Sequence, residues 1–319
     1  MPTLVLFLAL VISGCATAPP ECCDVRIGPS QYEYLSWQII NHANGGATLL
    51  SPDFSRLWDG RPSTQTRFEY NTSGTQTASS AWALQIQLAQ QGGSTPDSVV
   101  AGMVLIKKTN MPPGAVVQIM PTNISDSPIG FGSMQLDESG VTTSACILFE
   151  NQPVGPIVVA FLNNDGSGSQ YMTDGEAIEI GEIRVSESFE FCLKRTPKIG
   201  WANINKQRFT SSGLTLPVLQ PQLRTLQFEV APLAQQEAIN DGNQDMMTVI
   251  YTMMSGNVFA VVPFEGPDPA LYPAVGFNSD DNYKIRAKTA MLASFSGSPG
   301  MAMNNMLFWD TSMSVTESI

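Results

Sequence analysis

The chain has 319 residues, a net charge of −12, and 43% hydrophobic but only 14% charged residues. This length predicts about two domains, and the negative charge without clustered Lys and Arg argues against nucleic-acid binding through phosphate neutralisation. Its 26 Gly and 22 Pro residues with so few charges favour turn-rich β structure over helical bundles.

The N-terminus carries an uncharged apolar run over residues 4–12, followed by Ser13, Gly14 and Cys15. This order has the shape of a secretory signal, and the tetrad Ile12-Ser13-Gly14-Cys15 resembles a bacterial lipobox, in which Cys15 is the site of lipid attachment. The run lacks a preceding Lys or Arg and is shorter than the roughly 20 residues that span a bilayer. Residues 1–24 are therefore expected to form either a lipoprotein-type leader with a linker, or an apolar arm that is buried in an assembly.

Strand patterns follow one another from residue 25 to about residue 190. Residues 82–88 alternate with period two and residues 99–106 form a nearly continuous apolar run, as expected of a half-buried and a fully buried strand. The alternation between residues 178 and 193 changes phase at Gly181, which predicts a bulge. Further strands are predicted at residues 115–119, 146–149 and 157–162. We expect a mainly β chain whose residues 25–190 form a jelly-roll-like β-sandwich.

Residues 191–319 are predicted to form a smaller α+β domain with one main helix. Strands are expected where apolar residues alternate, at 214–218, 226–230 and 258–264. Met246, Met247, Ile250, Tyr251 and Met254 share one helical face, and this predicts a helix that packs on the core. The alternation of residues 283–291 predicts a surface strand with a basic outer face.

Few residues suggest catalysis. The one histidine, His42, lies in a turn-like segment without a nucleophile motif, which argues against Ser-His-Asp or Cys-His chemistry. The carboxylate pairs Glu179/Glu182 and Glu187/Glu190 are candidates for glycoside hydrolysis, but their alternation favours solvated residues on a strand face. We therefore expect no catalytic residue, no bound cofactor and no enzymatic activity.

One segment has metal-like spacing. Asn163, Asp165, Ser167, Gly168 and Asp174 fall at positions 1, 3, 5, 6 and 12 of an EF-hand-like loop. The match is degenerate and its flanks are predicted strands, which favours a hairpin loop, so no metal site is expected.

The five cysteines form no zinc-binding motif. Cys146 and Cys192 lie within apolar alternation and are expected to be buried thiols, with a disulfide between them as the alternative.

The order of several segments resembles known families. Residues 57–68, followed by the strand at 82–88 and the apolar run at 99–106, resemble the start of galactose-binding, discoidin-like β-sandwiches, and residues 181–187 resemble the closing strand. The succession through Gly200-Trp201 to residues 224–230 is similar to tail-tip and baseplate structural proteins of long-tailed bacteriophages. The resemblance covers about residues 50–260.

This resemblance implies a virion protein of the tail that acts in assembly and contacts host-surface carbohydrate. Its expected partners are other tail proteins and copies of itself, in a closed ring or trimer, and it supplies no catalytic residues. The alternative is a bacterial envelope lipoprotein with a carbohydrate-binding β-sandwich, anchored to the outer membrane through Cys15. Membrane contact is expected only in that case. A β-sandwich hydrolase is the third hypothesis.

Overall fold

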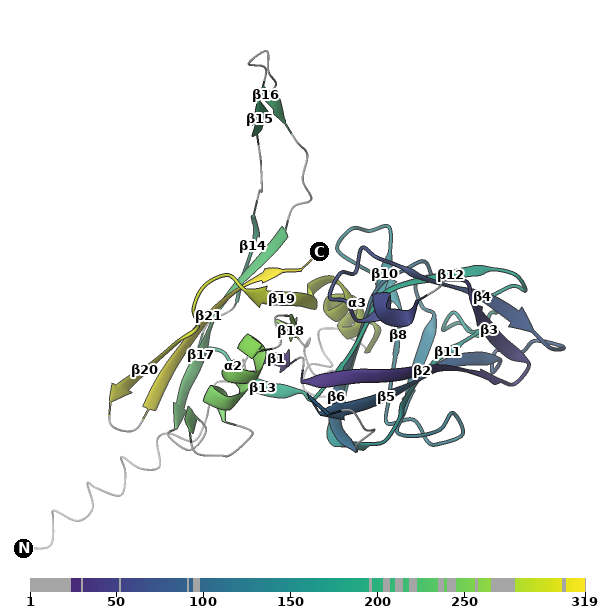
Figure 1. Cartoon of the computed structure of the whole chain (residues 1–319), viewed down its shortest axis with the longest axis horizontal. Helices are drawn as coiled ribbons and strands as arrows, with labels where there is room; N and C mark the ends of the chain where they lie inside the picture. Colours follow the sequence, from purple (N-terminus) through teal and green to yellow (C-terminus); the bar gives the residue numbers. More distant parts are fainter. Residues whose placement is uncertain are drawn as a thin grey trace, which may run out of the picture.

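The computed structural model describes residues 24–29, 31–51, 53–90, 92–93, 98–194, 197–202, 207–209, 215–217, 223–234, 238–239, 245–255, 258–264, 279–305 and 308–318. These residues form an eleven-stranded sheet, an eight-stranded sheet and a separate two-stranded sheet (Figure 1). The prediction of a mainly β chain, with a sandwich-like part and a smaller region that contains a helix, is confirmed.

The eleven-stranded sheet, with the loops between its strands, is called the larger unit. All its strand pairs are antiparallel, in the order β8-β7-β11-β5-β2-β3-β4-β12-β6-β10-β9. A short 3-10 turn, η1 (Phe54–Leu57), precedes β4. The strands are β2 (Tyr32–His42), β3 (Gly45–Leu49), β4 (Thr66–Thr72), β5 (Ala81–Gln90), β6 (Val99–Thr109), β7 (Val116–Met120), β8 (Gly130–Ser133), β9 (Gln135–Leu136), β10 (Thr143–Val154), β11 (Ile157–Leu162) and β12 (Ala177–Ser186).

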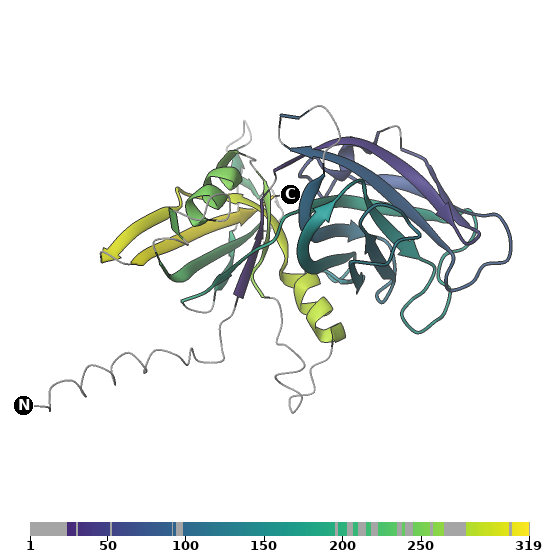
Figure 2. The same ribbon diagram turned by 90° about the horizontal axis from the view of Figure 1, so that it is seen from below.

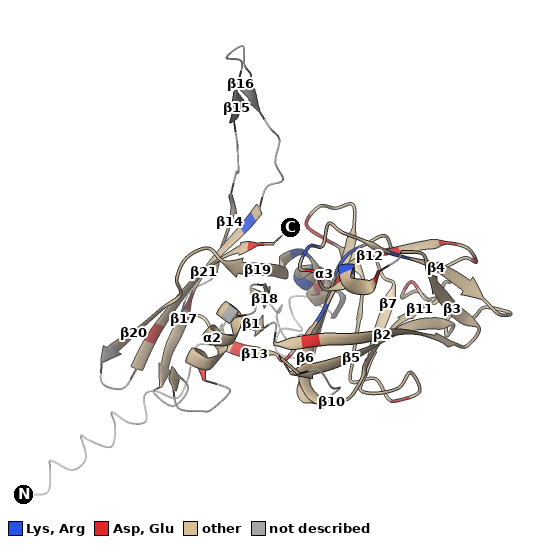
Figure 3. Ribbon diagram, viewed as in Figure 1, with Lys and Arg blue, Asp and Glu red and all other residues tan. Residues whose placement is uncertain are grey.

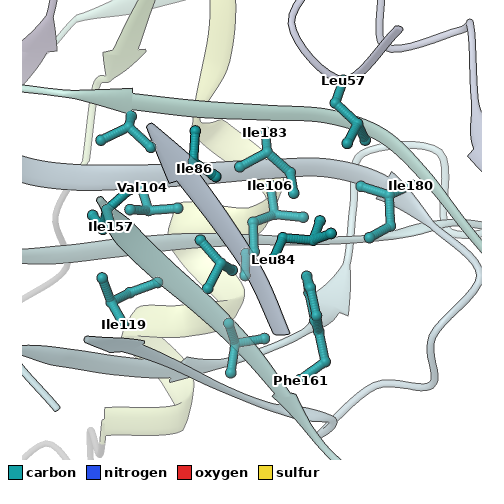
Figure 4. Packing of buried hydrophobic residues seen from close by; sticks show 14 of the residues in the cluster. Leu57, Leu84, Ile86, Val104, Ile106, Ile119, Ile157, Phe161, Ile180 and Ile183 are labelled. Atoms are coloured by element: carbon teal, nitrogen blue, oxygen red, sulfur yellow. The ribbon is translucent and has the colours of Figure 1, made fainter. Parts of the chain in front are cut away.

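This sheet folds over on itself around one apolar core. Its first strand in pairing order, β8, contacts β10 near the opposite edge. Gly130 on β8 allows this approach, because a Cβ there would lie 2.9 Å from a ring carbon of Phe149. Inside, buried aliphatic and aromatic side chains from many strands interdigitate (Figure 4). The predicted strands at 82–88 and 99–106 contribute Leu84, Ile86, Val104 and Ile106 to it.

The eight-stranded sheet and the helix α2 (Met246–Ser255) on one of its faces are called the smaller unit (Figure 2). Its main path runs β13-β1-β18-β19-β21-β17-β14, and β20 pairs with β21. The strands are β1 (Asp24–Gly28), β13 (Phe189–Cys192), β14 (Lys198–Ala202), β17 (Leu223–Ala234), β18 (Phe259–Val262), β19 (Met291–Phe295), β20 (Gly300–Asn305) and β21 (Phe308–Glu317).

The boundaries predicted for the two regions, residues 25–190 and 191–319, differ from the boundaries of the two sheets. The first strand, β1, pairs with β13 and β18 of the smaller sheet, and β13 already begins at Phe189. Val25 and Ile27 of β1 are buried in the cluster beneath α2. The described part of the chain thus starts in the smaller unit at β1, builds the larger one over residues 32–186 and then returns.

Residues 283–291 do not form the predicted surface strand. They belong to the helix α3 (Ser279–Thr289) and the start of β19. Arg286 and Lys288 lie in the last turn, where cations interact favourably with the helix dipole, and Lys284 pairs with Asp281 three residues earlier. The helix is polar and contacts β8, β9 and β10 of the larger unit.

The predicted change of phase at Gly181 is confirmed, but the predicted bulge is wrong: Ile180 pairs with Thr109 and Glu182 with Lys107, so neither strand carries an extra residue. Ile178 and Ile180 before it, and Ile183 and Val185 after it, all lie in the same core. Since alternate strand residues point to opposite faces, the strand changes face between them. The backbone of the partner strand β6 is irregular at the same point: Lys108, which the register places opposite Gly181, has a φ of 53°.

Candidate functional site

The two units meet across an apolar contact. Met103 and Leu105 of β6 and Cys146 of β10 pack against Ala260 and Val262 of β18, together with Leu292 of β19. The outer faces of β6 and β10 are therefore covered by the smaller sheet.

A buried charge cluster lies beside this contact. Lys107 of β6 is 1% exposed, and its ammonium group lies 3.1 Å from Glu138 Oε2 and 3.2 Å from the carbonyl oxygen of Ala290. Arg224 of β17 is 2% exposed, pairs with Glu317 of β21, and has Nη2 3.6 Å from the same Glu138 oxygen. We call Lys107, Glu138, Arg224 and Glu317 the interface charge cluster.

Burial affects the acids and bases of this cluster in different ways. It lowers the pKa of Lys107, against the raising effect of Glu138. For Glu317 burial alone would raise the pKa, but hydrogen bonds and charge from Arg224 outweigh it and hold the pKa below its usual value. The cluster therefore keeps the Glu317 carboxylate ionised. Its members come from both units.

A second pair of buried charges was missed by the sequence analysis. Glu182 was expected to be solvated, but it is fully buried beside Arg184 on the outer face of β12. The loop at residues 58–62 covers this face: the amide of Gly60 donates to Glu182 Oε2 over 3.1 Å, and Arg184 donates to the carbonyl of Trp58 over 3.1 Å. Burial, opposed by Arg184, raises the pKa of Glu182 to about 7.

The covering loop also contacts the C-terminal end. Ser318, after β21, donates a hydrogen bond to the carbonyl of Gly60 over 2.8 Å. Glu182 and Arg184 therefore support a loop that touches both units.

Four aromatic rings stack next to this loop. Trp37 lies between Trp58, at a centroid distance of 5.0 Å, and Phe54, at 6.1 Å, while Tyr34 stacks on Trp58 at 5.5 Å. The guanidinium of Arg184 lies 5.8 Å from the Tyr34 ring centre. Because the rings cover one another's faces, this stack mainly fixes the loop that contains Trp58.

The other carboxylate candidates have separate partners. Glu179 pairs with Arg67 at 3.0 Å, Glu190 with Arg26 at 2.6 Å, and Glu187 accepts a hydrogen bond from Gln31. None of these pairs contains a histidine.

His42 ends β2 at a two-residue hairpin turn. Both turn residues, Ala43 and Asn44, have positive φ, as type I′ hairpin turns require.

The EF-hand-like segment is a loop with capped turns. Asn163 is buried, and its side-chain oxygen accepts from the amides of Tyr171 and Met172. Asp165 accepts from the amides of Ser167 and Ser169. These side-chain oxygens accept hydrogen bonds from backbone amides. Among the described residues, no three or more His, Cys, Asp and Glu side chains lie close enough together to hold a metal ion.

The cysteines differ in their surroundings. Cys146 is buried on β10, as expected. The expectation is wrong for Cys192, which is exposed because it lies with Glu190 on the side of β13 opposite the buried Phe189 and Phe191. Cys15 lies outside the described residues.

Exposed apolar side chains gather on the smaller unit. Of the large hydrophobic side chains exposed in the described part of the chain, seven lie there: Ile199, Trp201, Met247, Tyr251, Met254, Met303 and Phe308. The larger unit carries four: Leu50, Phe131, Leu136 and Val141. The seven are divided among β14, α2, β20 and β21.

One edge of the smaller sheet leads into a projecting hairpin. The edge strand β14 carries Trp201, which is 56% exposed, and Ile199, which is 36% exposed. Further along the chain β15 (Gln207–Phe209) and β16 (Thr215–Pro217) pair with each other, join neither of the two larger sheets in the described part of the chain, and stand away from both (Figure 1). An isolated two-stranded hairpin is marginally stable in water. We call β14 with β15 and β16 the edge arm.

Figure 3 shows Lys and Arg gathered on α3, beside the larger unit. Among the described residues no helix combines the length and hydrophobicity needed to cross a membrane.

Comparison with known proteins identifies no family. No protein-family model matches the chain, and no curated protein has a similar sequence at a significant level.

Proposed function

We propose that this chain is a non-catalytic structural component of a bacteriophage tail tip or baseplate, located in the virion. The observation that carries an assembly role is the edge arm: β14, the last strand of the smaller sheet in the described part of the chain, carries exposed Trp201 and Ile199 and leads into a projecting hairpin. The tail itself is inferred from the resemblance over residues 50–260. Its partners are other tail proteins and copies of itself.

The proposal includes contact with carbohydrate on the host surface through the larger unit. Support comes from the resemblance to galactose-binding sandwiches and from polar side chains in loops, such as Thr122, Asn123 and Ser125 between β7 and β8. Side chains of this kind hydrogen-bond to sugar hydroxyls.

Incorporation of variants into particles tests the assembly role. The double variant Ile199→Ser with Trp201→Ser removes apolar contact area from the edge arm and leaves both cores intact. Since buried aromatic anchors dominate interface energetics, its co-sedimentation with particles should fall by about tenfold or more.

The matched control is Leu50→Ser with Val141→Ser, two exposed apolar positions on the larger unit. This control should be incorporated like the unchanged chain. Equal incorporation of both double variants would contradict an assembly role for the edge arm.

The tetrad Ile12-Ser13-Gly14-Cys15 favours a second candidate, a lipid-anchored envelope protein with a carbohydrate-binding sandwich. In that case native protein partitions with outer membranes and carries an acylated Cys15 at its N-terminus. Labelling host cells with a fatty-acid analogue and replacing Cys15 by Ala would detect this attachment.

A further inference from the structure

We propose that the apolar run at residues 4–12 packs on the exposed face of α2 in the same chain, on a stripe formed by Met247, Tyr251 and Met254. This goes beyond the proposed function. The tail interpretation expects residues 4–12 to be buried in an assembly without naming the surface, whereas this proposal names a surface of the same chain. It requires only that residues 1–14 are present.

The helix α2 is apolar on two faces. Met246, Val249, Ile250 and Met253 point into the core of the smaller unit, at spacings of three and four residues. The sequence analysis expected Met247, Tyr251 and Met254 to join them. Instead these three are 48%, 74% and 57% exposed.

The stripe is a continuous apolar row. Its residues are spaced by four and three, so their side chains lie next to one another along one side of the helix. A hollow beside Met254 lies toward β19 and has a mixed lining, with Phe295 and Pro299 as well as Ser294, Ser296 and Ser298. Methionine side chains are flexible and polarisable, which allows them to fit an irregular apolar partner.

The proposed occupant has matching chemistry. Residues 4–12 contain only Leu, Val, Phe, Ala and Ile, and no side chain of residues 1–12 is charged. Nine apolar residues in a row gain free energy by leaving water. The stripe carries no charge that they would have to desolvate.

The point at which this segment joins the fold places it within reach. Residue 24 begins β1, whose Val25 and Ile27 are buried in the same cluster as Met246 and Met253 of α2. The twelve residues 13–24 span up to about 40 Å when extended, and a helix of ten residues is about 15 Å long. The run can therefore reach the whole stripe from its own chain.

The rate at which hydrogen peroxide oxidises each methionine tests the contact. The full chain is expressed in the bacterial cytosol, and its intact mass confirms that it starts at Met1 or Pro2. Deletion of residues 2–12 should raise the oxidation rates of Met247 and Met254 several-fold, because their thioethers lose their cover. Met303, which is 56% exposed on β20, is the internal control and should not change. Unchanged rates at Met247 and Met254 after the deletion would overturn the proposal.

A photo-crosslinking amino acid identifies the occupant. Placed at Tyr251, it should form cross-links to residues 4–12; placed at Phe131, which is 65% exposed on β8, it should not. Mixing isotopically light and heavy copies separates contacts within a chain from contacts between chains. Cross-links from Tyr251 to another segment, or mainly between light and heavy copies, would overturn the proposal and leave the tail assignment untouched.

Discussion

Glu182 and Arg184, two residues apart on β12, form an ion pair of 2.6 Å in which the side chains are 0% and 7% exposed. Residues at this spacing share one face of a strand, and here that face is covered by the loop around Gly60. The pair anchors this loop, which in turn receives a hydrogen bond from Ser318 at the end of the smaller sheet.

Stability should fall as the pH rises through the pKa of Glu182. Its pKa is about 7 in the folded chain against a usual 4.5, mainly because of burial, so folding favours the protonated form. The stabilisation is complete below about pH 4.5 and is lost between that pH and about pH 7, by up to about 3 kcal/mol. Urea unfolding at pH 5, 6, 7 and 8 measures this change.

Two variants isolate the effect of Glu182. Glu182→Gln removes the titrating group, so the free energy of unfolding of this variant should depend less on pH between 5 and 8. Glu179→Gln, on the same strand but paired with Arg67 near the surface, should keep the pH dependence of the unchanged chain. If both variants kept it, Glu182 would not be its source.

Arg224→Met should destabilise the chain strongly. The substitution leaves Glu317 and the carbonyl of Lys288 without their buried donor. Removing one partner of a buried ion pair costs about 3–5 kcal/mol. Chemical denaturation would show this as a lower transition midpoint with an unchanged slope.

Lys194→Met is the matched control for Arg224→Met. Lys194 and Asp310 are 3.8 Å apart and are 41% and 34% exposed. A surface pair of this kind contributes about 0–1 kcal/mol. Similar losses in the two variants would show that the interface charge cluster does not hold the units together.

Gly181→Ala should also destabilise the fold. A Cβ at this position would lie 2.2 Å from the carbonyl oxygen of Pro62, which is backbone and cannot rotate away. Overpacking of this kind costs about 1–3 kcal/mol. Gly297→Ala, where a Cβ meets nothing within 4 Å, should change stability by less than about 0.5 kcal/mol. Thermal unfolding of both variants checks the difference, and equal midpoints would contradict the close approach at Gly181.

Millimolar calcium should leave the unfolding temperature unchanged. The oxygens of Asn163 and Asp165 already accept backbone hydrogen bonds within their loop. Asp165→Ala should lower the unfolding temperature equally with and without calcium. A rise of the unfolding temperature with calcium, absent in this variant, would show that the loop binds the ion.

Strands with a simple pattern were predictable. Ile157–Leu162 and the strand at 99–106 were found because continuous apolar runs bounded by turns indicate buried strands. The phase change at Gly181 was visible because the apolar residues alternate on both sides of it and shift by one position there. The helix α2 was predicted from the spacing of its apolar residues. The sequence could not show which of these residues face the core, because both long sides of the helix are apolar.

The missed features depend on contacts between distant segments. The alternation of residues 283–289 fits a strand, whereas Asp281 near the start of α3 and Arg286 and Lys288 in its last turn are the helix signal that would have corrected it. Glu182 is buried because the loop at residues 58–62 covers its face of β12, and Arg224 is buried where β17 meets the larger unit. A period of two cannot show that, because it identifies only which residues share a face.

The intact mass of the native protein tests the central claim most directly, when it is measured in parallel on purified particles and on host membranes. An assembled tail component predicts a chain recovered from particles with residues 1–14 retained. A lipidated chain that begins at Cys15, present in membranes and missing from particles, would contradict this account.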